Sequence, residues 1–242
     1  MAKEDAVKDD AHGHGGDAHP KWLQHHFDTP LQQFEAAKFG IWLFLVTEIL
    51  MFGGLFVAFG IWRTLEPSVF HLAHEHLNKK MGAINTVVLL FSSLTAALAV
   101  RSSQLGKKNQ TSLYLVITIL CAFAFLVVKY FEYTHKLHEG LLPGRCFGYS
   151  WCHNDRASAL VHETVNELPP RAAMYFAIYF MMTGLHGLHV TIGIGILIWI
   201  LVRNMRNEFT KEYFTPVDVA ALYWHLVDLI WIYLFPLLYL VG

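Results

Sequence analysis

Five long apolar segments follow one another along the chain, and polar stretches separate them. They cover residues 39–62, 81–104, 112–134, 172–202 and 217–241. A helix needs about 20 mostly apolar residues to cross the hydrocarbon core of a bilayer, and each segment is long enough. The segments are too long for strands and show no period-2 alternation, so they are expected to be helices. The pattern predicts an all-α membrane protein, in which residues 39–242 form a bundle of five transmembrane helices.

A hydrophilic tail, residues 1–38, precedes the first span and contains five histidines but no apolar run. It lacks the charged, apolar and small-residue order of a cleaved signal peptide, so we expect it to be retained. Near its end, Thr29-Pro30-Leu31-Gln32 is typical of a helix start: Thr29 can cap, Pro30 suits the first helical position, and Gln32 can reach back. We expect a short helix at the membrane surface that leads into the first span.

The distribution of basic residues predicts the orientation of the chain. With the N-terminus inside, the inner segments contain ten lysines and arginines and the longer outer segments contain seven. Cytoplasmic loops of membrane proteins carry the excess of positive charge. We therefore expect the N-terminus in the cytoplasm and the C-terminus in the periplasm of a bacterial inner membrane.

The overall composition agrees with a membrane protein and excludes several partners. Hydrophobic residues make up 55% of the chain and charged residues 15%, against about 25% charged residues in ordinary soluble domains. The net charge of −1 offers no field that would recruit nucleic acid. Three cysteines are too few for a disulfide framework. Cys146 and Cys152 lie in the long loop 137–171, which the orientation places outside, where a disulfide is permitted but not required.

Five ionisable side chains lie deep within the spans, away from the span ends, where each costs on the order of 3 kcal/mol on insertion scales. A rise of about 1.5 Å per residue places Glu48 roughly 15 Å from the inner surface, which is close to the midplane. His225 and Asp228 of the last span fall at a similar depth, and His186 and His189 of the fourth span lie slightly farther out. Because isolated polar groups would be unsatisfied, we expect one buried polar layer that links the first, fourth and fifth helices.

The roles of these groups remain open at this stage. Glu48 lies in an uninterrupted apolar stretch, so it is a candidate for proton exchange or for reaction with a hydrophobic carbodiimide. It can equally be an inert hydrogen-bond donor between helices. The four other groups, His186, His189, His225 and Asp228, are more often hydrogen-bonded to neighbouring helices than bound to a metal or haem. Lys129 and Glu132, three residues apart, are expected to pair or to extend toward the interface.

The other histidines and the basic residues at helix ends indicate a binding site less clearly. His71, His74 and His76 have spacings that can bind a transition metal, but a solvated loop is the favoured interpretation. Arg203 and Arg206 at the inner end of the fourth span are candidates for positive-inside anchors or for clamps on lipid phosphate. The chain contains no haem-attachment CxxCH, no GxGxxG, no P-loop and no convincing metal constellation. If the chain belongs to an enzyme, another chain carries the chemistry.

Several sequence blocks, in order, resemble subunit III of haem–copper cytochrome c oxidases. They are KFGIWLFLVTEILMFGGLFVAF, GAINTVVLLFSSLTAALAV, VKYFEYTHKLHEG, MTGLHGLHVTIG and YWHLVDLIWIYLFPLLYL. The resemblance covers about residues 35–240, and the last two blocks are the most specific. The mitochondrial form has seven helices, so this chain is similar to the five-helix bacterial form.

The resemblance implies an accessory subunit of a proton-pumping terminal oxidase that oxidises cytochrome c and reduces oxygen. It implies no redox centre in this chain, with haem and copper in the partner subunits I and II. It also implies phospholipid bound in a cleft, support of proton uptake, and a place beside other respiratory complexes. Glu48 matches the buried, carbodiimide-reactive carboxyl of the family. Arg203, Arg206 and His225 become candidates for contact with lipid headgroups, and no residue is expected to be catalytic.

Alternatives within and outside the family stay open. The matching subunit of a quinol oxidase and an accessory protein of a nitric oxide reductase are the nearest, although the segment TEILMF favours the cytochrome c branch. A stand-alone proton translocator that uses Glu48 would be expected to have helix breaks and a repeat, and neither is seen. A di-haem cytochrome would use His186, His189 and His225.

Overall fold

The computed structural model describes residues 23–24, 27–73, 79–138 and 172–240, and everything in these ranges that has regular structure is helical. Five of the helices are long and apolar enough to cross a membrane, which confirms the predicted class. The elements are α1 (Pro30–Leu65), α2 (Pro67–Ala73), α3 (Lys79–Gln104), α4 (Lys108–His138), α6 (Ala172–Met205), α7 (Thr215–Phe235) and a short π-helical segment, η3 (Pro236–Leu240).

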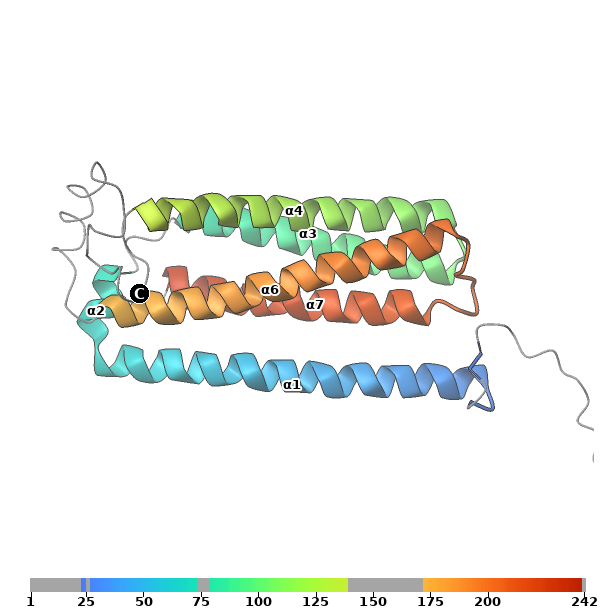
Figure 1. The fold of residues 1–242 in the computed structure, drawn as a ribbon, viewed down its shortest axis with the longest axis horizontal. Coiled ribbons are helices and arrows are strands. Elements are labelled where there is room, and N and C mark those ends of the chain that lie inside the picture. The colour runs from blue at the N-terminus through green and yellow to red at the C-terminus, as the bar shows by residue number, and fades with distance from the viewer. Residues whose placement is uncertain (1–22, 25–26, 74–78, 139–171, 241–242) are drawn as a thin grey trace, which may run out of the picture.

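The long helices run side by side, with their ends at two common levels (Figure 1). The start of α1, the turn between α3 and α4 and the link between α6 and α7 lie at one end, here called the N-terminal end. The short helix α2 and the end of α7 lie at the other, here called the α2 end. Neighbouring long helices are therefore mostly antiparallel, as short connections require.

The helix α1 begins where the sequence predicts a helix start. The sequence predicts a short surface helix that leads into the first span, and one continuous helix extends from Pro30 to Leu65. The residues between Leu31 and Phe39 include neither proline nor glycine, so nothing breaks the backbone hydrogen bonding there. The expected cap is present: the Thr29 hydroxyl accepts the N–H of Gln32 at 3.2 Å. The Gln32 side chain reaches back to the N–H of Asp28 at 2.9 Å.

The core of the bundle lies between α3, α4, α6 and α7. The side chains of Trp224 and Trp231 on α7 are completely buried there. Each indole N–H donates to a hydroxyl of α3: Trp224 to Ser92 at 2.8 Å and Trp231 to Thr86 at 3.1 Å. Hydrogen bonds between helices in a bilayer contribute about 0.6 kcal/mol on average, so packing of the large rings contributes more. The two contacts fix the register of α7 against α3.

The helix α1 is attached to this core by a narrow contact. Its buried side chains are Leu45, Phe52 and Phe59, which are spaced by seven residues and so lie along one line of the helix. Most of its other apolar side chains are exposed. A helix held along so narrow a seam leaves room for grooves on both of its sides, and the structure contains one on each.

Candidate functional site

A groove of about 690 Å³ lies between α1, α6 and α7 in the half of the bundle nearer the N-terminal end. Its walls are mostly apolar, with Ile41, Phe44 and Ile196 among the side chains that line it. Gln33, Trp199 and Tyr213 line the part near the N-terminal end, and Glu48 and His189 line the part near mid-bundle. Polar groups therefore occupy the two ends of a groove whose middle suits a hydrocarbon chain.

Glu48 and His189 form a hydrogen-bonded pair that joins α1 to α6. Glu48 Oε2 lies 2.9 Å from His189 Nε2, and the two side chains are only 14% and 11% exposed. The other ring nitrogen of His189, Nδ1, lies 2.8 Å from the carbonyl oxygen of Leu185. The Phe52 ring packs edge-on against the imidazole at 5.4 Å. Burial and these two hydrogen bonds hold the imidazole in one orientation.

The geometry restricts the protonation of this pair. The Leu185 carbonyl can only accept, so the hydrogen of that bond lies on His189 Nδ1. A second hydrogen must lie between Nε2 and the Glu48 oxygen. The pair is then either an imidazolium with a carboxylate or a neutral imidazole with a carboxylic acid. In both forms Glu48 and His189 share one exchangeable proton at the edge of the groove.

Two ion pairs lie toward the N-terminal end. Lys38 of α1 lies 3.3 Å from Asp218 of α7. Arg203 Nε lies 2.5 Å from Glu208 Oε2. The guanidinium of Arg203 also stacks over Trp199, which lines the groove, at 4.8 Å. Arg203 is thus fixed near the wall of the groove, whereas Arg206 is exposed at the same end.

The other intramembrane groups lie apart from the groove and have separate surroundings. His225 Nδ1 lies 2.7 Å from the hydroxyl of Ser93, so this side chain faces α3. His186 is packed between the rings of Phe125 and Trp231, at 5.6 and 5.3 Å. Asp228 is 2% exposed. Within the described ranges, neither the His186 nitrogens nor the Asp228 oxygens make a hydrogen bond. The structure therefore brings Glu48 to His189 but does not join the five groups into one hydrogen-bonded layer.

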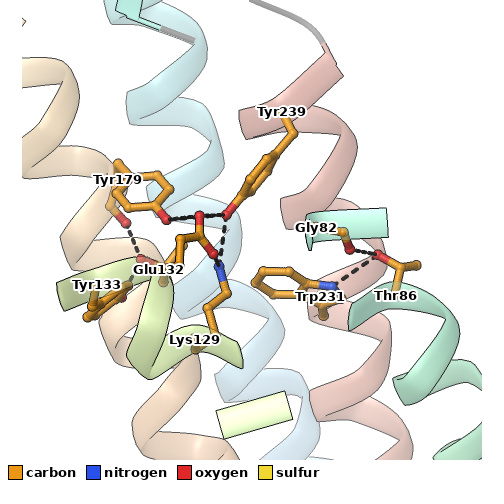
Figure 2. Close-up of polar contacts among 9 residues, drawn as sticks. Gly82, Thr86, Lys129, Glu132, Tyr133, Tyr179, Trp231 and Tyr239 are labelled. Atoms are coloured by element: carbon orange, nitrogen blue, oxygen red, sulfur yellow. Dashed lines mark hydrogen bonds and ion pairs between the residues drawn. The ribbon is translucent and has the colours of Figure 1, made fainter. Parts of the chain in front are cut away.

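A second polar cluster lies near the α2 end, between α4, α6 and η3 (Figure 2). Lys129 Nζ lies 2.8 Å from Glu132 Oε2 and donates to the Tyr239 hydroxyl at the same distance. The hydroxyls of Tyr179, at 2.8 Å, and of Tyr239 donate to Glu132 Oε1. The ammonium also lies 4.4 Å from the centre of the Trp231 ring. Both charges are buried, and each of them is paired and hydrogen-bonded.

Comparisons with known proteins show which proteins the chain is similar to. Residues 167–242 match the family described as cytochrome c oxidase subunit III. The "Quinol oxidase subunit 3" of Bacillus spizizenii is 28% identical over 203 residues, 84% of this chain and 86% of that relative. The "Probable quinol oxidase subunit 3" of Staphylococcus haemolyticus is 24% identical over 215 residues, 89% and 94% of the two chains. The protein of that name in Staphylococcus aureus strain USA300 is 26% identical over the same length and shares.

These matches support the haem–copper oxidase subunit III family for this chain. They support a place in a membrane-bound terminal oxidase complex, which implies catalytic subunits as partners. The matched relatives and this chain cover most of one another.

Some predicted sites of the chain fall outside the described residues. Cys146, Cys152, His74 and His76 are among them. The described residues contain no group of three or more histidines, cysteines, aspartates or glutamates that could hold a metal ion.

Sequence reasoning missed part of the second cluster of this subunit III. The spacing of Lys129 and Glu132 predicted their pairing. It gave no sign that Tyr179 and Tyr239, which are 47 and 107 residues from Glu132, complete the cluster. The available signal was the position of both tyrosines at the ends of apolar spans, where a buried hydroxyl requires a partner.

Proposed function

We propose that this subunit III is the accessory chain of a proton-pumping terminal oxidase that oxidises cytochrome c and reduces oxygen in a bacterial inner membrane. Haem and copper belong to the catalytic partners in this proposal, and the N-terminus lies in the cytoplasm. The membership of the family supports the role, and the segment TEILMF supports the cytochrome c branch.

The observation that carries the proposal is the hydrogen-bonded contact of Glu48 with His189 at mid-bundle depth. A carboxyl and an imidazole that share one proton can exchange it without leaving a bare charge in the apolar groove. The groove extends from this pair to the N-terminal end, which is cytoplasmic in the proposed orientation. The pair is therefore suited to support proton uptake on the inner side.

The same groove is proposed to hold a phospholipid chain of the inner leaflet. Its middle is apolar, and Arg203 and Trp199 lie at the end where a headgroup would be. Arg206 is exposed at the same level and can contact a phosphate directly. His225 lies on the α3 side of α7 and is not among the residues that line this groove, so it is not assigned to the headgroup.

The test starts with the complex that is obtained by purifying this chain together with its partner subunits. A reduced-minus-oxidised spectrum is expected to show haem from the co-purifying subunits, and the subunit separated from them is expected to be colourless. A hydrophobic carbodiimide is expected to label Glu48. The variant Glu48→Gln should lose this label while the complex remains assembled, because the amide can still hydrogen-bond to His189. Continued labelling, or a chromophore that stays with the isolated subunit, would contradict the proposal.

A second candidate is the matching subunit of a quinol oxidase. It is favoured by the printed names of the relatives, which are quinol oxidase subunits. The two candidates differ in the electron donor, which acts on the partner subunits. Oxygen consumption by the purified complex with reduced cytochrome c and with a quinol, in parallel, distinguishes them. Oxygen consumption with the quinol but not with reduced cytochrome c would contradict the cytochrome c proposal and favour the quinol oxidase.

A further inference from the structure

Three polar side chains are buried in the core around the indole of Trp231. Asp228 of α7 and His186 of α6 are 2% and 1% exposed, and Asn85 of α3 is completely buried. Within the described ranges, none of their side-chain oxygen and nitrogen atoms makes a hydrogen bond. Most buried polar side-chain atoms in folded proteins have a partner, so three such groups in one core require an explanation.

The three side chains come from three helices and border the same ring. The His186 imidazole packs on the Trp231 indole, with 5.3 Å between the ring centres. Asp228 lies three residues before Trp231, so the two side chains are on the same face of α7. Asn85 directly precedes Thr86, whose hydroxyl accepts the indole N–H at 3.1 Å (Figure 2). The polar atoms are therefore gathered at one level of the bundle core.

The described neighbours of these groups supply too few hydrogen bonds. The His186 imidazole lies between two aromatic rings, at 5.6 and 5.3 Å, and these rings offer no acceptor oxygen or nitrogen. The hydroxyl of Ser93 lies next to Asp228 and is bonded to Nδ1 of His225 at 2.7 Å. It has a single hydrogen, so it can serve at most one of the two Asp228 oxygens. Several donors and acceptors therefore need a partner other than these side chains.

The chemistry of the three groups selects the kind of ligand. The amide of Asn85 and a neutral imidazole each need a donor and an acceptor, and the carboxyl oxygens of Asp228 need donors. A cation would satisfy the oxygens but would leave the N–H groups of Asn85 and His186 without an acceptor. Water both donates and accepts, and a buried water makes about three hydrogen bonds to otherwise unsatisfied groups. Water therefore matches all three side chains.

We propose that this part of the core binds ordered water, which hydrogen-bonds to Asp228, His186 and Asn85. We call it the core water site. His186 lies one helical turn from His189, whose imidazole is bonded to Glu48, so the site brings bound water close to that pair. The water connects intramembrane groups that direct hydrogen bonds leave separate. The site does not depend on the electron donor of the oxidase or on the role proposed for Glu48.

The first experiment is a cryo-electron microscopy map of the purified complex at a resolution that shows ordered water. The expected result is at least one water density within hydrogen-bond distance of an Asp228 oxygen and of a polar atom of His186 or Asn85. A continuous apolar core without density there would overturn the proposal. A density with five or more oxygen neighbours at about 2.4 Å would identify a cation and would also overturn it.

The second experiment measures how the variants Asp228→Leu and His186→Phe, alone and together, change the melting temperature of the subunit in the complex. Each single variant should lower it by about 2–4 °C for every hydrogen bond lost. The double variant should lower it by clearly less than the sum, because both residues bind the same water. Asp228→Asn, which can still bond to water, should shift it less than Asp228→Leu. The control is Asp228→Leu combined with Thr95→Val, a buried hydroxyl nearer the N-terminal end, and these two effects should add.

Two results of this experiment would overturn the proposal. A higher melting temperature of Asp228→Leu or His186→Phe would show that the groups are dry and unsatisfied, because apolar replacements then remove a cost. Additive effects of Asp228→Leu and His186→Phe would show that the two residues share no water. If the apolar variants do not assemble, the map of the unmodified complex decides by itself.

Discussion

Gly193 of α6 lies directly against the indole ring of Trp224 of α7. A Cβ added at Gly193 would lie 2.8 Å from two carbon atoms of that ring, which is closer than real contacts permit. The ring cannot move aside easily, because it is completely buried and its N–H is bonded to Ser92. The closest approach of α6 and α7 therefore depends on the absence of a side chain at this position.

Gly193→Ala is expected to destabilise the subunit by about 1–3 kcal/mol, because the added methyl group forces the two helices apart. The matched control is Gly195→Ala, two residues along α6, where the added Cβ has no atom within 4 Å. Thermal unfolding of the purified complex, followed by loss of this subunit, measures the difference. Equal melting of both variants would contradict the close contact.

The buried pair of Lys129 and Glu132 predicts that a variant lacking only the carboxylate is much less stable than a variant lacking both charges. Glu132→Gln leaves the Lys129 ammonium buried without its counter-charge, which costs about 3–5 kcal/mol. Adding Lys129→Met removes that charge and should recover most of the loss. The yield of assembled subunit and its melting temperature report both effects. A double variant that is no more stable than Glu132→Gln would show that the pair is not the source of the cost.

The narrow attachment of α1 predicts that one aromatic side chain is critical for it. Phe52 is 1% exposed and packs against His189, so Phe52→Ala should weaken the contact of α1 by about 3–5 kcal/mol. Hydrogen exchange of the α1 amides, measured by mass spectrometry, should increase while exchange in α7 stays the same. Leu50→Ala, at an exposed position of the same helix, is the control and should change neither.

Because Arg203 forms an ion pair with Glu208, variants of the two residues can show whether Arg203 serves the structure or binds a lipid headgroup. If Arg203 holds a headgroup, Arg203→Gln depletes the bound inner-leaflet lipid and shortens the working life of the oxidase. Glu208→Gln breaks the same ion pair but leaves the guanidinium, so it should retain the lipid. Lipid analysis and activity over repeated turnover measure the two. Equal lipid content in all of these proteins would remove the headgroup assignment.

The sequence was sufficient for the five membrane helices because their length and apolar composition follow from the thickness of the bilayer. From the rise per residue it also placed Glu48 and His189 in one polar layer, with His189 slightly farther out, and the structure pairs them. It could not separate this pair from His225 and Asp228, because depth alone does not give the rotation of each helix about its axis. The bond from His225 to Ser93, 132 residues away, depends on that rotation.

The surroundings of His186 also could not be predicted from the sequence. Its spacing from His189 suggested a shared polar role, yet its ring packs between Phe125 and Trp231 from two other helices. Aromatic packing of this kind is decided by how neighbouring helices fit together, which no single-helix pattern encodes.

The wide π-helical turn of η3 has a practical consequence for work on this oxidase. It aims Tyr239, three residues from the C-terminus, at Glu132 inside the bundle. A truncation that removes Tyr239, such as a tag fused immediately after Leu238, would take one hydroxyl donor away from the buried Glu132 carboxylate. Tyr239 and the turn of η3 should therefore stay intact in any tagged version of the chain.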